Sequence, residues 1–161
     1  MSKIKPCLWF NGHAEEAANF YVSLLPDSRI DRVQNNVVDG ASGKAGTAVM
    51  IEFTLAGQNF LALNGGVPQE YTHAVSFSVD CADQSEVDQL WDALSKGGSP
   101  VQCGWLKDRY GVSWQIVPSA LPKMLGDPDP AKARRVMQAM LKMIKLDIAA
   151  LQVAYDGAPG G

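Results

Sequence analysis

The sequence predicts an α+β protein in which two βαβββ units form a curved mixed sheet with a cup, followed by a long C-terminal helix. The clearest observation is a strand–helix–strand pattern from residue 74 to residue 118. A weaker copy of this pattern occupies residues 4–64 and makes an internal repeat. A lone unit would leave one sheet face bare, whereas two units side by side enclose a cup with the helices outside.

The domain organisation follows from the repeat. We expect a paired domain over residues 1–118 and a helical extension over residues 119–161. In the first unit, alternation along the strand turns Leu8 and Phe10 to one face and Lys5, Cys7 and Trp9 to the other. The expected elements of this unit are strands over 4–10, 28–35, 47–56 and 58–64 and a helix over 14–24.

The second unit opens with a strand expected over residues 74–80, in which Val75, Phe77 and Val79 form the apolar face. A helix follows, with Asp83 or Ser85 as its N-cap. Its apolar positions recur at helical spacing, and two glycines end it. The last strand is expected over residues 112–117.

The extension is expected to form one helix over residues 131–155, with Asp129 as the cap and Pro130 at the first helical position. Its apolar residues fall on two stripes, whereas a surface helix of a monomer needs one. We therefore expect a homodimer in which this helix takes part; the alternative is that both stripes pack within one chain. The stripes are Val136, Met140, Ile144, Ile148, Leu151 and Tyr155, and Met143, Leu146, Ala150 and Val153.

Composition narrows the function classes. The chain has 161 residues, 47% of them hydrophobic, and a net charge of -3, which argues against nucleic acid or an anionic membrane as a partner. No apolar stretch approaches the roughly 20 residues of a membrane span, and the N-terminus has no signal-peptide form. The three cysteines form no Cys-x-x-Cys pair, a pattern typical of reduced thiols in the cytoplasm.

Several segments resemble the PhnB-like proteins of the vicinal-oxygen-chelate superfamily, which contains glyoxalase I, bleomycin-resistance proteins and extradiol dioxygenases. The resemblance is carried by LWFNGHAEEAANFY, GQNFLALNGG, SFSVDCADQSEVDQLWDALSKGG and WLKDRYGVSWQIVP. This family is often labelled 3-demethylubiquinone 3-methyltransferase. No G-x-G-x-x-G follows a strand here, so the residues indicate no nucleotide cofactor.

The resemblance also implies four metal-ligand positions, which fall on Lys5, Asn64, Ala74 and Gln115. Lysine is cationic at neutral pH and alanine cannot ligate, so only two neutral amides could donate an oxygen. We therefore expect no metal and no other cofactor. His73 would reach the cup only through a one-residue slip that turns the apolar face of its strand away from the core.

A metal-free cup could still bind a small molecule, because apolar walls with a few convergent polar groups are typical of ligand pockets. Glu52 is the candidate catalytic residue: desolvation would raise its pKa and suit it to act as a general base. The alternative is a structural ion pair with Lys5 or Lys107. The candidate ligand-binding residues are Lys5, Cys7, Trp9, Met50, Ser76, Ser78, Trp105 and Gln115.

Trp9 and Trp105 could stack on a flat ligand or pack in the core, since tryptophan serves both purposes. Three functions remain open. The first, which we favour, is binding of an unknown small molecule in the metal-free cup. The second is an enzyme of the glyoxalase or dioxygenase type with an unconventional site, and the third is the methyltransferase of the family label.

Overall fold

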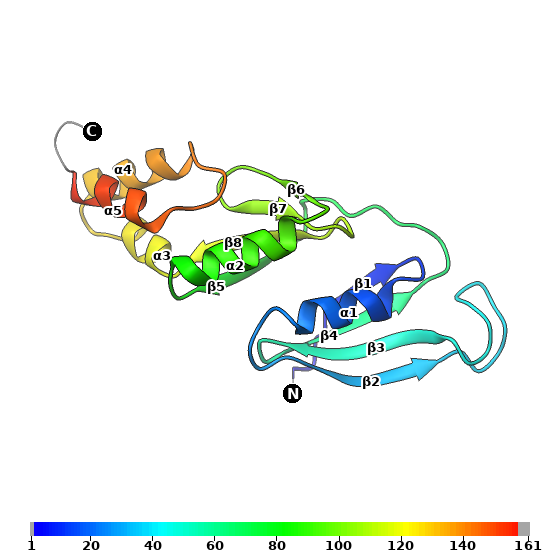
Figure 1. Cartoon of the computed structure of the whole chain (residues 1–161). Helices are drawn as coiled ribbons and strands as arrows, with labels where there is room; N and C mark the ends of the chain where they lie inside the picture. Colours follow the sequence, from blue (N-terminus) through cyan, green and yellow to red (C-terminus); the bar gives the residue numbers. More distant parts are fainter. Residues whose placement is uncertain (1, 158–161) are drawn as a thin grey trace. The chain divides into compact units, whose positions relative to one another are not determined.

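The computed structural model describes residues 2–157 of the chain, which divides after Glu70 into two compact units. Each unit has one four-stranded mixed sheet with a helix on one face (Figure 1). In both units the order of elements is strand, helix and three strands. The predicted α+β class and the βαβββ repeat are therefore confirmed.

In the first unit, the strand order is β1-β4-β3-β2, with β1 parallel to β4 and the other pairs antiparallel. Alternation turns Phe10, Ile51 and Phe53 toward α1, and each is at most 5% exposed. The ring of Phe53 lies between those of Tyr21 and Phe60. The elements are β1 (Cys7–Phe10), α1 (Ala14–Val22), β2 (Arg29–Asn35), β3 (Ala48–Leu55) and β4 (Gln58–Asn64).

In the second unit, the order β5-β8-β7-β6 repeats this arrangement, and β5 is parallel to β8. Trp114 and Ile116 are buried on the face that α2 covers, together with Leu90 and Leu94 of that helix. The Asp83 side chain caps α2 by accepting from the N–H of Glu86. The elements are β5 (Phe77–Cys81), α2 (Gln84–Ser95), β6 (Ser99–Pro100), β7 (Trp105–Lys107) and β8 (Ser113–Pro118).

The strand expected from residue 74 begins only at Phe77. The hydroxyl of Thr72 accepts the N–H of Ala74 at 3.1 Å and stabilises a turn in place of strand pairing. Val75 consequently lies 70% exposed, so its predicted place on the apolar face was wrong. Phe77 and Val79 keep the predicted alternation with Ser76 and Ser78.

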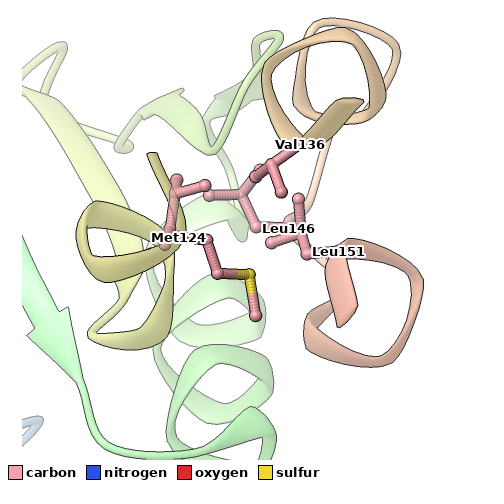
Figure 2. Packing of buried hydrophobic residues seen from close by; sticks show 5 residues of the cluster. Met124, Val136, Leu146 and Leu151 are labelled. Atoms are coloured by element: carbon pink, nitrogen blue, oxygen red, sulfur yellow. The ribbon is translucent and has the colours of Figure 1, made fainter. Parts of the chain in front are cut away.

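Three helices follow the second sheet and enclose a small apolar core of their own (Figure 2). Leu121 and Met124 come from the first of them, Val136 from the second and Leu151 from the third. Leu146 enters this core from the segment between the last two helices. The helices are α3 (Ala120–Leu125), α4 (Pro130–Met140) and α5 (Ile148–Asp156).

The prediction of one long helix over residues 131–155 was wrong, because the chain leaves the helix after Met140 and re-enters it at Ile148. The backbone carbonyls of Met143 and Ile144 accept the N–H groups of Cys103 and Gly104 at 2.8 and 2.7 Å. An uninterrupted helix would use these carbonyls internally. The interruption also turns Leu146 into the core while Ile144 stays 56% exposed, so the two predicted stripes do not exist as such.

A glutamine of α2 fixes the extension to the second unit. The Gln84 amide donates to the carbonyl of Leu146 at 3.1 Å and accepts from the N–H of Ile148 at 2.8 Å. Beside it, Lys145 forms an ion pair with Asp88 at 2.8 Å. These contacts, together with the pairing at Gly104, hold the interrupted segment against the sheet unit.

The homodimer stays a prediction, now based on the exposed apolar residues that follow α4. Leu141 and Ile144, both 56% exposed, stand beside the turn that replaces the helix. We expect light scattering to give a dimer at micromolar concentration, and Leu141→Lys combined with Ile144→Lys to give a monomer. Val37→Lys, at an 88% exposed position of the first unit, is the control that should stay dimeric. A monomeric unmodified chain would contradict the prediction.

Within residues 2–157, none of the helices combines the length and the apolar character that crossing a lipid bilayer requires.

Candidate functional site

The face of the first sheet turned away from α1 carries most of the predicted ligand-binding residues of that unit. Because Leu8 and Phe10 lie beneath the helix, Cys7 and Trp9 point to this open face. The same alternation along β3 turns Met50 and Glu52 to this open face. The register supports this placement: Leu63 of β4 is paired with both Trp9 and Met50.

A hollow of about 460 Å³ occupies one end of this open face. Its size falls within the roughly 300–1,000 Å³ that is usual for small-ligand pockets. Phe53 and Phe60 also border it, but their rings stack with each other and with Tyr21 on the opposite face, beneath α1. Its polar lining includes Lys5, Arg29, Asp31, Glu52, Thr54 and Asn59.

Hydrogen bonds join the polar residues of the hollow into a row that crosses three strands. The Asn59 amide donates to the Thr54 hydroxyl at 3.1 Å, and that hydroxyl donates to Asp31 Oδ2 at 2.6 Å. Arg29 Nε lies 2.8 Å from Asp31 Oδ1. Because Asp31 is bound at both oxygens, its carboxylate is held in one orientation.

Glu52, the predicted catalytic residue, lies at the edge of this row with its side chain 34% exposed. Glu52 forms an ion pair with Arg32, the residue opposite it on β2, with 3.8 Å between Glu52 Oε1 and Arg32 Nε. The ion pair that was the alternative role for Glu52 is therefore present, but within this unit its partner is Arg32 and not the expected Lys5. A carboxylate with this much exposure and a cation nearby is suited to binding a polar group.

The structure assigns packing roles to part of this face. The indole N–H of Trp9 donates to the Val67 carbonyl at 2.8 Å. A Cβ atom at Gly65 would lie 1.8 Å from the Trp9 ring, so the segment after β4 packs directly on the indole. Cys7 is exposed, and partial desolvation raises the pKa of its thiol, which keeps it protonated at neutral pH.

The remaining predicted residues lie on the open face of the second sheet. Ser78 and Trp105 are both paired in register with Gln115, and the Gln115 amide donates to the Ser76 hydroxyl at 3.0 Å. His73 Nδ1 lies 2.7 Å from the Ser113 hydroxyl. The His73 ring meets the Trp105 ring edge-on, with centroids 5.7 Å apart. One sheet face therefore holds all four predicted residues of this unit.

Sequence reasoning missed most of the residues that line the hollow, among them the members of its polar row. Thr54 continues the alternation of Met50 and Glu52 along β3, so the same rule could have included it. Asn59 is paired with Thr54 across the tight turn at Gly57, and hairpin register could have found it. The contributions of Arg29 and Asp31 depend on a register shift in β2 between Ile30 and Arg32, for which the sequence has no clear signal.

Comparison with known proteins identifies the family. Residues 2–117 match the family model described as 3-demethylubiquinone-9 3-methyltransferase. The chain belongs to this family. A solved Bacillus cereus structure described as a PhnB protein is 36% identical, with a TM-score of 0.67, and the match covers 73% of this chain and 100% of that one. The resemblance to PhnB-like proteins is thereby confirmed.

A second solved structure, of a protein from Pseudomonas aeruginosa, shares the fold at 21% identity. Its TM-score is 0.61, over 73% of this chain and 98% of that one. A search of curated proteins found no match. The family match ends at residue 117, near the end of β8 and before α3. The helical extension of this PhnB-like protein therefore lies outside the matched region.

The metal site of the superfamily does not fit the residues of this family member. The Asn64 side chain lies 7% exposed, accepting from Ala14 N at 2.9 Å and donating to the Ala48 carbonyl at 3.0 Å. The Asn64 side chain therefore caps α1. This corrects the expectation that its amide oxygen could be donated to a metal ion. The Gln115 amide nitrogen is bonded to Ser76, Ala74 has no donor atom, and Lys5 brings a positive charge.

We expect the purified protein to contain no stoichiometric metal at these four positions. The physical reason is the donor set: one ammonium, one methyl group and two neutral amides cannot compete with water for a divalent ion. Elemental analysis by plasma mass spectrometry after desalting checks this. One tightly bound zinc, nickel or iron per chain, retained after brief exposure to a chelator, would contradict the prediction.

Proposed function

We propose that this PhnB-like protein binds a small molecule in the hollow on the open face of its first sheet. The observation that carries the proposal is the preorganised polar row of Asn59, Thr54 and Asp31 within a hollow of suitable size. Polar groups held by the fold lose little entropy on binding, which improves affinity. Lys5 and Glu52 add charges at its edge.

The chemistry of such a site is recognition through charge and hydrogen bonds. Lys5 supplies an ammonium group on a flexible stem, and Glu52 and Asp31 supply carboxylates that are partly shielded from water. Partial shielding strengthens charge pairing relative to the open surface. No step of this proposal requires a metal, and the residues of the second sheet face stay as predictions for binding.

The proposal is tested by amide NMR with isotope-labelled protein and a library of small polar molecules. We expect hits whose shift changes centre on Glu52, Thr54 and Asn59. Lys5→Gln and Glu52→Gln should each weaken such a hit about tenfold, which corresponds to the loss of one charge contact of about 1.4 kcal/mol.

Glu70→Gln is the matched control. It removes a carboxylate at an exposed position outside the hollow, so it should leave the affinity of each hit unchanged. Hits that never perturb the hollow, or that bind both hollow variants as well as the unmodified chain, would overturn the proposed function.

A further inference from the structure

The charges that line the hollow are of both signs and are unevenly paired. They comprise two basic and three acidic side chains: Lys5, Arg29, Asp27, Asp31 and Glu52. Glu52 has a partner in Arg32, which is not part of the lining. The other four charges decide what the hollow itself can attract.

One corner of the hollow retains a net negative charge. Arg29 is shared between two carboxylates, with Nε 2.8 Å from Asp31 Oδ1 and Nη1 4.0 Å from Asp27 Oδ1. Two carboxylates and one guanidinium leave one uncompensated negative charge. The Asp31 side chain is 27% exposed, whereas those of Arg29 and Asp27 are 62% and 73% exposed. Within this corner, therefore, the Asp31 carboxylate is the one partly withdrawn from water, where a cationic partner stabilises it more than on the open surface.

The other corner is positive. Lys5 lines the hollow but forms no ion pair with any residue in the described range 2–157. It precedes β1, whereas Asp31 lies in β2 at the far edge of the same sheet. Three strand spacings of about 4.8 Å separate the backbones that carry the two corners, so the two charges are not neutralised by each other in direct contact.

From this pattern we infer that the ligand of the hollow is a small zwitterion, with an anionic group for Lys5 and an ammonium group for Asp31. This inference rests on the proposed function and adds the chemical class of the ligand. A singly charged molecule would desolvate the opposite corner without compensating it, which costs free energy. The hydroxyl of Thr54 and the amide of Asn59 lie between the strands of the two corners, where they can contact the ligand backbone.

A length series of ω-amino acids tests the inference by calorimetry. The probes are glycine, β-alanine, 4-aminobutyrate and 6-aminohexanoate, with butyrate and butylammonium as singly charged controls. We expect at least one amino acid to bind ten times more tightly than either control. Lys5→Gln and Asp31→Asn should each remove this advantage, whereas Lys3→Gln, at an exposed position outside the lining, should keep it.

The outcomes separate the ligand class from the binding function. Butyrate binding as tightly as every amino acid, and still weakened by Lys5→Gln, would overturn the zwitterion while supporting the hollow as a site. No binding by any amino acid would also overturn the zwitterion, and the library screen would then decide the function independently. Amino-acid binding that survives both Lys5→Gln and Asp31→Asn would place the ligand elsewhere and overturn both. Circular dichroism of each variant verifies that it is folded.

Discussion

Leu146→Ala is expected to lower the free energy of unfolding of the second unit by about 2–5 kcal/mol, the usual cost of removing a buried leucine side chain. Leu146 is fully buried among Met124, Val136 and Leu151 (Figure 2). Its own backbone carbonyl is held by Gln84, so the segment cannot easily collapse into the cavity. A cavity that cannot collapse puts the cost toward the upper end of this range.

Urea unfolding followed by circular dichroism and tryptophan fluorescence measures this effect. Val136→Ala and Val153→Ala provide a matched pair of controls, because they delete the same atoms at positions 0% and 54% exposed. We expect the first to cost about 1.6 kcal/mol or more, at roughly 0.8 kcal/mol for each buried methylene-sized group, and the second almost nothing. A stability for Leu146→Ala within 0.5 kcal/mol (about the error of such measurements) of the unmodified protein would show that the extension has no core of its own.

Asp108→Ala is expected to lower the free energy of unfolding by roughly 2–4 kcal/mol, because it leaves buried hydrogen-bond donors without an acceptor. The carboxylate is 3% exposed. One oxygen accepts the N–H groups of Tyr110 and Val112 at 2.8 and 3.0 Å, and the other accepts the Trp114 indole N–H at 2.9 Å. The side chain thus closes the turn before β8 and orients the indole beneath α2.

Asp108→Asn separates the charge from the shape. Its carbonyl oxygen can still accept from the turn, but its NH2 group would face the Trp114 indole N–H, donor against donor. We expect Asp108→Asn to have a free energy of unfolding between those of the unmodified protein and Asp108→Ala, and a shifted tryptophan emission. Asp92→Ala, at an exposed position on α2, is the control and should change stability little. Equal stability of Asp108→Ala and Asp92→Ala would refute the structural role.

The same two residues show how far sequence reasoning reached. The last strand was expected to begin at residue 112, but the contact between Asp108 and Trp114 was not expected. Leu146 was assigned to an apolar stripe, correctly as a hydrophobic position but on a helix that is interrupted there. In each case the local pattern located a strand or an apolar position, while the hydrogen-bond or packing partner depended on the tertiary fold.

In the candidate site, too, some features were predicted from the sequence and others depend on the fold. Alternation along the two strands predicts that Cys7, Trp9, Met50 and Glu52 share one sheet face, since side-chain direction in a strand changes with every residue. The partners differ from expectation, with Glu52 beside Arg32 and Trp9 beneath the chain at Gly65. The Arg29–Asp31 corner arises from irregular pairing between β2 and β3.

Periodicity in the sequence was sufficient to determine the repeated βαβββ units and the side chains that share a face, because both properties depend on neighbours within a few residues. Only the tertiary structure decided where the last helix breaks, which carboxylates share Arg29, and that Asn64 caps α1 instead of facing a ligand. Those features depend on hydrogen bonds and charges between segments distant in sequence: Ala14 with Asn64, Gly104 with Ile144, and Gln84 with Leu146. A backbone carbonyl or carboxylate accepts whichever donor the fold brings within about 3 Å, and residue order alone does not specify that donor.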